Sequence, residues 1–255
     1  MSNSHPSYIT IIANSNDYDQ MSEAEKPFYK EEGEFYLRMN RNLPSDQFAA
    51  VTCNRVTIEN SILNYDSNLH FVVAKQNYIS GKLHIDEIDD FLTAVFGPNQ
   101  PFASIDSFGQ KVLLNLSKFD GPITLSPELA NILGFNGCEF KGDDLIYSDK
   151  APDIYRKFRP LYLCADFCDL TTYTTEKREK LLCTIDTSGL GAAANNSSVI
   201  NAFYSAPIWR RASIHLPIYT QLKLLDSSFM PVPTDKNCKL SIELTFRSLS
   251  YYDQL

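Results

Sequence analysis

The sequence lacks the features that mark membrane, secreted and nucleic-acid-binding proteins. No apolar run approaches the roughly 20 residues needed to cross a bilayer, and residues 1–10 (MSNSHPSYIT) do not place a basic region before an apolar one, as a secretory signal would. Lys and Arg number 23 against 31 Asp and Glu, which gives a formal net charge of −8. Broad contact with nucleic acid needs clustered basic residues. We therefore expect a protein that folds inside the cell, with no membrane span and no nucleic-acid partner.

Motifs that would indicate an enzyme are also missing. The chain contains no Gly-x-Ser-x-Gly nucleophile elbow and no glycine motif for phosphate or dinucleotide binding. The four histidines are dispersed along the chain: His5, His70, His84 and His215. No nucleophile, base and orienting group can be assembled from the sequence. We predict no catalytic residue, no cofactor-binding residue, no metal ligand and no cofactor.

The cysteines do not follow a metal-binding or disulfide pattern. The six residues are Cys53, Cys138, Cys164, Cys168, Cys183 and Cys238. Cys164 and Cys168 are four apart, but no second Cys or His pair stands at the spacing of a zinc site. In a chain without a secretory signal, we expect buried, reduced thiols rather than disulfides.

What the sequence does contain is a repeated strand pattern. A hydrophobic content of 44% is enough for a sizeable core. Residues 239–247 alternate cleanly, with Leu240, Ile242, Leu244 and Phe246 on one face. We predict strands at 8–13, 35–39, 47–59, 69–75, 102–107, 111–117, 123–125, 161–166, 179–187, 199–204, 212–219 and 239–247, and a hairpin at 137–147. A chain of mostly strands with only two helices predicts a β-sandwich or barrel.

The two predicted helices have recognisable boundaries. In residues 126–135 (SPELANILGF), Ser126 is a good N-cap and Gly134 a good C-terminal residue. In residues 85–96 an apolar stripe is formed by Ile85, Ile88, Leu92 and Val95. Asp86 and Glu87 are predicted in the first turn, and Gly97-Pro98 ends the helix. Asp89-Asp90 is expected on the solvated side of the helix at 85–96.

Several surface features are assigned to loops and edges. The acidic stretch 17–34 predicts a long solvated loop, and residues 188–198 (SGLGAAANNSS) predict a mobile one. Lys141-Gly142-Asp143 resembles an integrin-binding tripeptide but is interpreted as a turn. The single tryptophan, Trp209, is expected to anchor the edge of a strand.

The order of several segments resembles a known family, the minor capsid (penton) proteins of Polinton/Maverick elements, adintoviruses and virophage-like viruses. The most specific segment is 125–135 (LSPELANILGF), which is similar to the family's serine-started helix ending in Leu-Gly-Phe. The other segments are 77–96 (NYISGKLHIDEIDDFLTAVF), 102–116, 161–166 (LYLCAD), 204–216 and 242–247 (IELTFR). Together they run in the family's order from about residue 45 to residue 247.

The resemblance implies an all-β protein with two short helices, folded as a jelly-roll β-sandwich. Residues 1–255 would form a single jelly-roll domain with a helix-containing insertion at about 77–147. It implies a non-enzymatic structural component of the virion that is made and assembled inside the host cell. Homopentamers would occupy the five-fold vertices of an icosahedral capsid, among trimers of a double jelly-roll major capsid protein. A host surface receptor is a further candidate partner.

Two other functions are compatible with the residues. The first is a vertex-associated β-sandwich module that binds a receptor or glycan through the 17–34 or 188–198 loop. The second is an enzyme, which the missing catalytic constellation argues against.

Overall fold

The structure is a computed structural model of the 255-residue chain. It describes residues 8–15, 33–38, 50–59, 62–63, 71–73, 76–77, 85, 87–97, 103–106, 111–117, 122–141, 145–169, 171–172, 178–187, 199–206, 208–212, 219–235 and 238–247. The chain divides into two compact units. Unit 1 contains Met1–Ser61, Phe158–Ser188 and Ser197–Leu255, and unit 2 contains Ile62–Lys157 and Gly189–Asn196.

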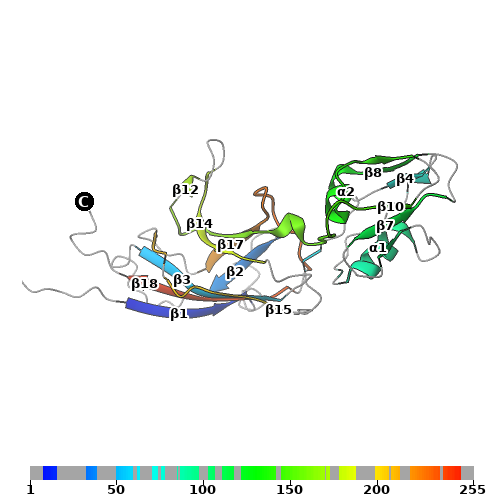
Figure 1. The fold of residues 1–255 in the computed structure, drawn as a ribbon. Helices are drawn as coiled ribbons and strands as arrows, with labels where there is room; N and C mark the ends of the chain where they lie inside the picture. The colour runs from blue at the N-terminus through cyan, green and yellow to red at the C-terminus, as the bar shows by residue number, and fades with distance from the viewer. Residues whose placement is uncertain are drawn as a thin grey trace, which may run out of the picture. The chain divides into compact units, whose positions relative to one another are not determined.

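The first sheet of unit 1, sheet A, has the strand order β1-β18-β3-β15, and the short β16 also pairs with β3 (Figure 1). Its strands are β1 (Tyr8–Asn14), β3 (Ala50–Glu59), β15 (Val199–Phe203), β16 (Arg210–Arg211) and β18 (Leu240–Arg247). All of its pairings are antiparallel. The first and last strands of unit 1 are therefore neighbours, with Tyr8 opposite Arg247.

The second sheet of unit 1, sheet B, has the order β14-β11-β17-β2. Its strands are β2 (Glu34–Arg38), β11 (Leu161–Ala165), β14 (Leu181–Ile185) and β17 (Tyr219–Leu225). A separate two-stranded ribbon joins β12 (Thr171–Thr172) to β13 (Arg178–Glu179). A 3-10 turn at Arg156–Phe158 precedes β11.

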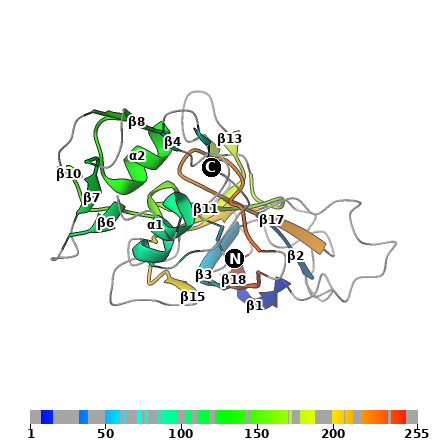
Figure 2. The ribbon, with the colours of Figure 1, turned by 90° about the vertical axis from the view of Figure 1, so that its right-hand side faces the viewer.

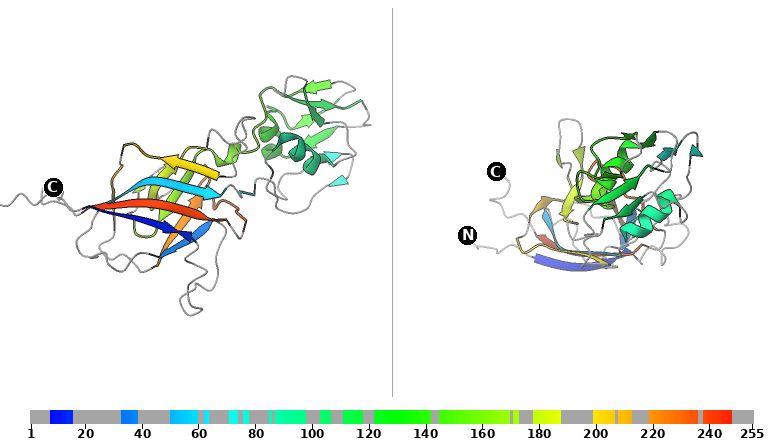
Figure 3. Two further views of the ribbon diagram at one scale, coloured as in Figure 1. Left: turned by 90° about the horizontal axis from the view of Figure 1, so that it is seen from below. Right: turned by 45° about the vertical axis from the view of Figure 1, so that its right-hand side comes forward.

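The two sheets have the connectivity of a jelly roll. Apart from β16, their strands in chain order are β1, β2, β3, β11, β14, β15, β17 and β18. Sheet A then contains the first, eighth, third and sixth of these strands, and sheet B the fifth, fourth, seventh and second. Figure 3 shows β15, β3, β18 and β1 side by side, with sheet B behind them. This arrangement is the double-sheet jelly roll, so the predicted jelly-roll β-sandwich with a mainly β chain is confirmed.

The core of unit 1 lies between the two sheets and follows from strand alternation. In β18, Leu240, Ile242, Leu244 and Phe246 are buried while the residues between them are partly exposed. Leu222 and Leu224 of β17 are fully buried in sheet B. The rings of Phe246 and Phe167 approach to 5.9 Å between centroids. Each such buried side chain contributes roughly 1.5–3 kcal/mol of transfer free energy.

Unit 2 contains both helices and two small antiparallel sheets (Figure 2). The sheets have the orders β10-β7-β6 and β5-β4-β8-β9. The helices are α1 (Ile88–Phe96) and α2 (Pro127–Leu133), and the strands are β4 (Phe71–Val73), β5 (Gln76–Asn77), β6 (Ala103–Ile105), β7 (Val112–Asn115), β8 (Ile123–Leu125), β9 (Glu139–Phe140) and β10 (Leu145–Tyr147).

Helix α2 has the boundaries that its sequence predicts. The Ser126 hydroxyl accepts a hydrogen bond from the Leu129 amide at 3.3 Å, which satisfies one free N–H of the first turn. Gly134 ends the helix with a φ of 85°, and the Phe135 amide donates to the Ala130 carbonyl at 2.8 Å. The Phe135 ring then packs edge-on against Phe140, 4.9 Å away.

Helix α1 begins later than predicted. Glu87 is its N-cap, so Asp89 and Asp90, rather than Asp86 and Glu87, occupy its first turn. Asp89 and Asp90 are exposed, as expected. The helix ends at Gly97, whose amide donates to the Thr93 carbonyl, in agreement with the predicted end.

One strand prediction is wrong, and another falls mainly outside the described residues. The predicted hairpin at 137–147 does not exist, because β9 pairs with β8 and β10 pairs with β7 in a different sheet. The strand predicted at 212–219 stays a prediction, because residues 213–218 lie outside the described residues; the next described strand is β17, at Tyr219–Leu225. Within the described part of that segment, Ala212 forms only an isolated bridge to Cys168.

Candidate functional site

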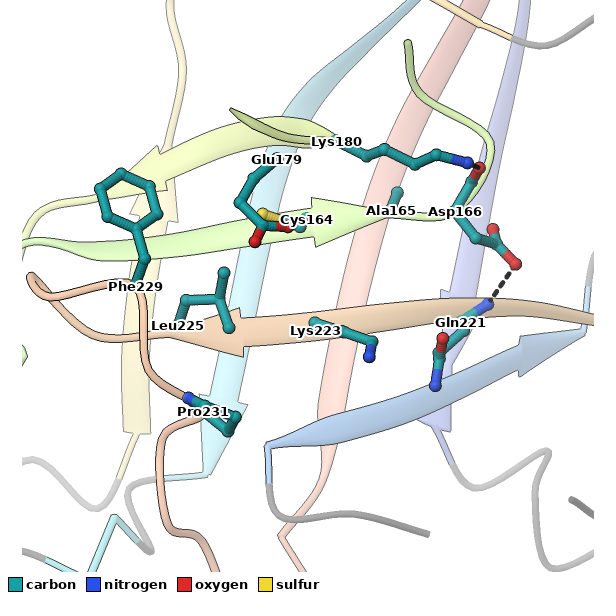
Figure 4. A pocket seen from close by; sticks show the side chains of 10 residues that line it. All are labelled: Cys164, Ala165, Asp166, Glu179, Lys180, Gln221, Lys223, Leu225, Phe229 and Pro231. Atoms are coloured by element: carbon teal, nitrogen blue, oxygen red, sulfur yellow. Dashed lines mark hydrogen bonds between the residues drawn. The ribbon is translucent and has the colours of Figure 1, made fainter. Parts of the chain in front are cut away.

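A pocket of about 400 Å³ opens on sheet B, on the face that points away from the core (Figure 4). Its lining comes from β11, β13, β17 and the turn that follows β17. The polar lining residues are Asp166, Glu179, Lys180, Gln221 and Lys223, and the apolar ones are Cys164, Ala165, Leu225, Phe229 and Pro231. One side of the pocket is therefore apolar and the other is charged.

The turn after β17 builds the apolar wall. Buried Asp226 holds this turn, because its Oδ1 accepts hydrogen bonds from the amides of Ser228 at 2.8 Å and Met230 at 3.0 Å. Phe229 has a φ of 60°, a conformation that costs a bulky side chain on the order of 1–3 kcal/mol. Its ring stacks on Tyr162 with 4.6 Å between centroids and 5° between planes. The stacked pair covers the outer surface of β11.

A buried carboxylate organises the strand beside the pocket. Glu34 of β2 is 5% exposed. It accepts hydrogen bonds from the Gln221 side-chain amide at 2.6 Å and the Tyr36 hydroxyl at 3.0 Å, and it pairs with the Lys223 amine at 3.2 Å. These partners satisfy the charge that burial would otherwise destabilise. The prediction that 17–34 is a solvated loop is wrong for Glu34, and residues 17–32 lie outside the described residues.

The far end of the pocket is closed by Asp166, which follows β11. Its carboxylate accepts hydrogen bonds from the Thr220 hydroxyl and, at 3.0 Å, from the Gln221 backbone amide. The Lys180 amine donates to the Asp166 backbone carbonyl at 2.6 Å. Both lysines of the pocket are thus engaged within the same chain, Lys180 here and Lys223 at Glu34.

Glu179 differs from the other charged residues of the pocket. Among the described residues, no side chain forms a hydrogen bond or salt bridge with its carboxylate. It lies beside Cys164 (Figure 4). Burial, and secondly the negative charge of Glu179, raise the pKa of the Cys164 thiol to about 12. The pocket therefore presents one uncommitted carboxylate against an apolar wall.

The outer face of sheet A carries a different surface. The Arg247 guanidinium lies 4.6 Å from the centroid of the Trp209 ring, and the Tyr8 ring lies 6.1 Å from it. Arg55 lies 4.8 Å from the Phe203 ring centroid on the same sheet. Tyr8, Ile12, Phe203 and Ile208 are all more than half exposed. Exposed apolar side chains beside arginines are typical of interaction surfaces. Trp209 directly precedes β16.

The cysteines are free, and all except the half-buried Cys138 are buried, which agrees with the predicted burial of the thiols. A hydrogen bond to Cys183 and burial raise the pKa of Cys53, and burial raises that of Cys168.

Across the described residues, His, Cys, Asp and Glu side chains do not gather in threes as a metal site would require. None of the described helices is long and apolar enough to cross a membrane.

The structure describes only some of the residues that the sequence singled out. The 188–198 loop and Gly142-Asp143 lie outside the described residues. Lys141 is an exposed residue paired with Glu139 at 3.0 Å. The sequence did not predict the pocket, because its residues come from separate strands and no local motif links 164–166, 179–180 and 221–231.

Comparison with known proteins supports the fold. No protein-family model and no curated protein sequence matches the chain. The crystal structure of the mavirus penton protein is similar to it, with a TM-score of 0.50 and 9% sequence identity, over 95% of this chain and 100% of that one. At this identity the likeness concerns the fold.

Proposed function

We propose that this chain is a minor capsid (penton) protein that forms homopentamers at the five-fold vertices of an icosahedral capsid. The observation that carries the proposal is the jelly-roll connectivity of sheets A and B, together with a fold similar to the mavirus penton protein over 95% of the chain. The sequence resemblance to the Polinton, adintovirus and virophage-like penton family supports it independently. In this proposal, about 77–147 is the helix-containing insertion of one jelly-roll domain.

The surfaces of unit 1 suit assembly into a ring. A closed ring of five identical subunits uses heterologous contacts, in which one patch of a subunit meets a different patch of its neighbour. The outer face of sheet A carries exposed aromatic and aliphatic side chains with arginines. The outer face of sheet B carries a pocket in which the Glu179 carboxylate pairs with none of the described side chains. Two unlike faces on one sandwich meet the requirement for a heterologous contact.

The proposed role is structural rather than catalytic. A vertex protein needs a rigid fold and side surfaces for its neighbours, and unit 1 supplies a packed core and two distinct faces. The expected partners are further copies of the chain and a double jelly-roll major capsid protein, and the expected location is the virion. A host surface receptor is a further candidate partner.

The solution mass of the purified chain tests the proposal. We expect a particle of five times the 28.9 kDa chain mass by light scattering coupled to size-exclusion chromatography at several concentrations. Co-expression with the major capsid protein should place the chain in the assembled shell. A closed particle with another copy number, or shells that exclude the chain, would contradict the proposal.

A further inference from the structure

We propose that the pocket on sheet B binds a basic side chain from a second copy of this chain, presented by the outer face of sheet A. Glu179 is the residue that receives it, and Arg211 is the residue that supplies it. This inference rests on the proposed function, because it names the two surfaces that meet in the ring.

The chemistry of the pocket selects a cation with an apolar stem. Lys180, Lys223 and Asp166 are already engaged within the chain, as described above. As far as the described residues show, Glu179 is therefore the charged group of the pocket that is available to a ligand. Leu225 and Phe229 lie along the apolar side of the same pocket. An arginine or lysine side chain fits such a site, since its methylenes pack on apolar surface while its head pairs with a carboxylate.

The outer face of sheet A presents such a side chain. Arg247 of β18 and Arg211 of β16 both pair with Ala50 of β3, one from each side, and Tyr8 pairs with Arg247. Residues opposite each other across strands share a face. This row therefore contains two arginines with no acidic residue between them, next to Trp209.

Arg211 is the better donor of the two arginines. Arg247 is already stacked on the Trp209 ring. Arg211 is exposed, and no side chain in the described part of the protein pairs with its guanidinium. Exposed Ile208 lies three positions earlier. A free guanidinium beside apolar groups is complementary to a free carboxylate beside an apolar wall.

The position of the two surfaces favours a second copy over an unrelated partner. The pocket and the arginine row lie on opposite outer faces of one sandwich. A contact between them therefore joins subunits head to tail. One end subunit of such a row keeps an unoccupied pocket, and the other keeps an unoccupied arginine row. Such contacts close into rings when the rotation allows it.

Charge reversal in solution tests this contact. We expect Glu179→Lys and Arg211→Glu each to raise the protein concentration for half-maximal assembly at least about tenfold in sedimentation equilibrium. The double variant Glu179→Lys/Arg211→Glu restores the ion pair with reversed polarity, so it should assemble nearly as the parent does. Glu139→Lys, an equal charge change on an exposed residue of β9, is the matched control and should leave assembly unchanged.

Mixing the single variants gives a sharper result. In an equimolar mixture, contacts are favourable only between unlike variants, because each variant repels its own kind. A ring with an odd number of subunits cannot alternate two variants completely. The mixture should therefore associate without closing five-membered rings, whereas the double variant closes them.

Different results contradict the Glu179–Arg211 contact and the vertex role. Assembly that is unchanged by Glu179→Lys and Arg211→Glu overturns the inference and leaves a pentameric penton protein intact. A parent chain that stays monomeric alone yet enters shells also overturns the second copy as occupant. Exclusion from shells contradicts the function. Circular dichroism and thermal unfolding of each variant establish that a loss of assembly is not a loss of fold.

Discussion

The guanidinium of Arg247 stacks over Trp209 at 4.6 Å, next to Tyr8, at one end of the outer face of sheet A. Trp209 is the single tryptophan of the chain, so its fluorescence reports on this site alone. We expect its emission to shift to shorter wavelength as the protein concentration rises through the assembly range, because the ring leaves water. Glu179→Lys should not show the shift over the same range. Emission that is independent of assembly would place the contact elsewhere.

Gly134→Ala should destabilise unit 2 by about 2 kcal/mol or more. Gly134 has a φ of +85°, and an added Cβ would lie 2.2 Å from the Lys150 carbonyl oxygen. The positive φ and the clash with Lys150 both disfavour an alanine in the left-handed conformation that ends α2. Gly137→Ala is the matched control, because its added Cβ meets no atom within 4 Å. Urea unfolding followed by circular dichroism compares the two variants, and equal losses would contradict the assigned role of Gly134.

Phe246→Ala should destabilise unit 1 by about 3–5 kcal/mol. The side chain is fully buried and packs against Phe167, so its removal leaves a cavity between the sheets. Thr10→Ala on the outer face removes one exposed hydrogen bond to Thr245 and should cost less than about 1 kcal/mol. Thermal and denaturant unfolding give both values. Similar losses for the two variants would be inconsistent with a core at Phe246.

Glu34→Ala should cost about 2–3 kcal/mol, because it leaves Gln221 and Lys223 without the carboxylate that both contact. Glu59→Ala is the matched control. Its pairing with Lys239, at 3.8 Å, joins side chains that are each about half exposed, and exposed pairs contribute less than about 1 kcal/mol. Denaturant unfolding measures the difference. If both variants lose the same stability, the Glu34 network has no special role.

Alkaline pH should destabilise the protein through its buried thiols. The pKa of Cys164 rises from 9.0 to about 12 on folding, so the folded state favours the protonated thiol. The stabilisation is complete below pH 9, where both states are protonated. It is lost between pH 9 and about 12 as the unfolded chain ionises first, by up to about 1.4 kcal/mol per pH unit for each such thiol.

Unfolding free energies at a series of pH values from 7 upward test this prediction. Cys164→Ala should flatten the decline, whatever its effect on stability at pH 7. A slope that is identical with and without Cys164 would show that this thiol does not contribute.

Local sequence patterns predicted local features of the fold well. The alternation in β18 and the Ser126 and Gly134 boundaries of α2 depend on neighbouring residues, and the structure has both as predicted. The jelly-roll class followed from the resemblance and from the number of strands. These features needed no knowledge of long-range pairing.

Long-range pairing explains what the sequence did not predict. Residues 137–147 looked like a hairpin, but each half pairs with a different earlier strand. Glu34 stands in an acidic segment, and its burial depends on Gln221, 187 positions away. The pocket depends on the same kind of contact, since strands distant in the sequence bring its residues together. Neither spacing nor composition contains that information.

The pairing of β1 with β18 has a consequence for synthesis on the ribosome. Among the described strands, β1 pairs with β18 alone, with Tyr8 opposite Arg247, and β18 separates β1 from β3. A nascent chain cannot complete sheet A until residues 240–247 have left the exit tunnel. Chains that stop earlier retain unpaired edges on β1 and β3, and such edges promote aggregation. Sheet A is therefore completed only after residues 240–247 have been synthesised, so chains that stop earlier do not carry the intact outer face.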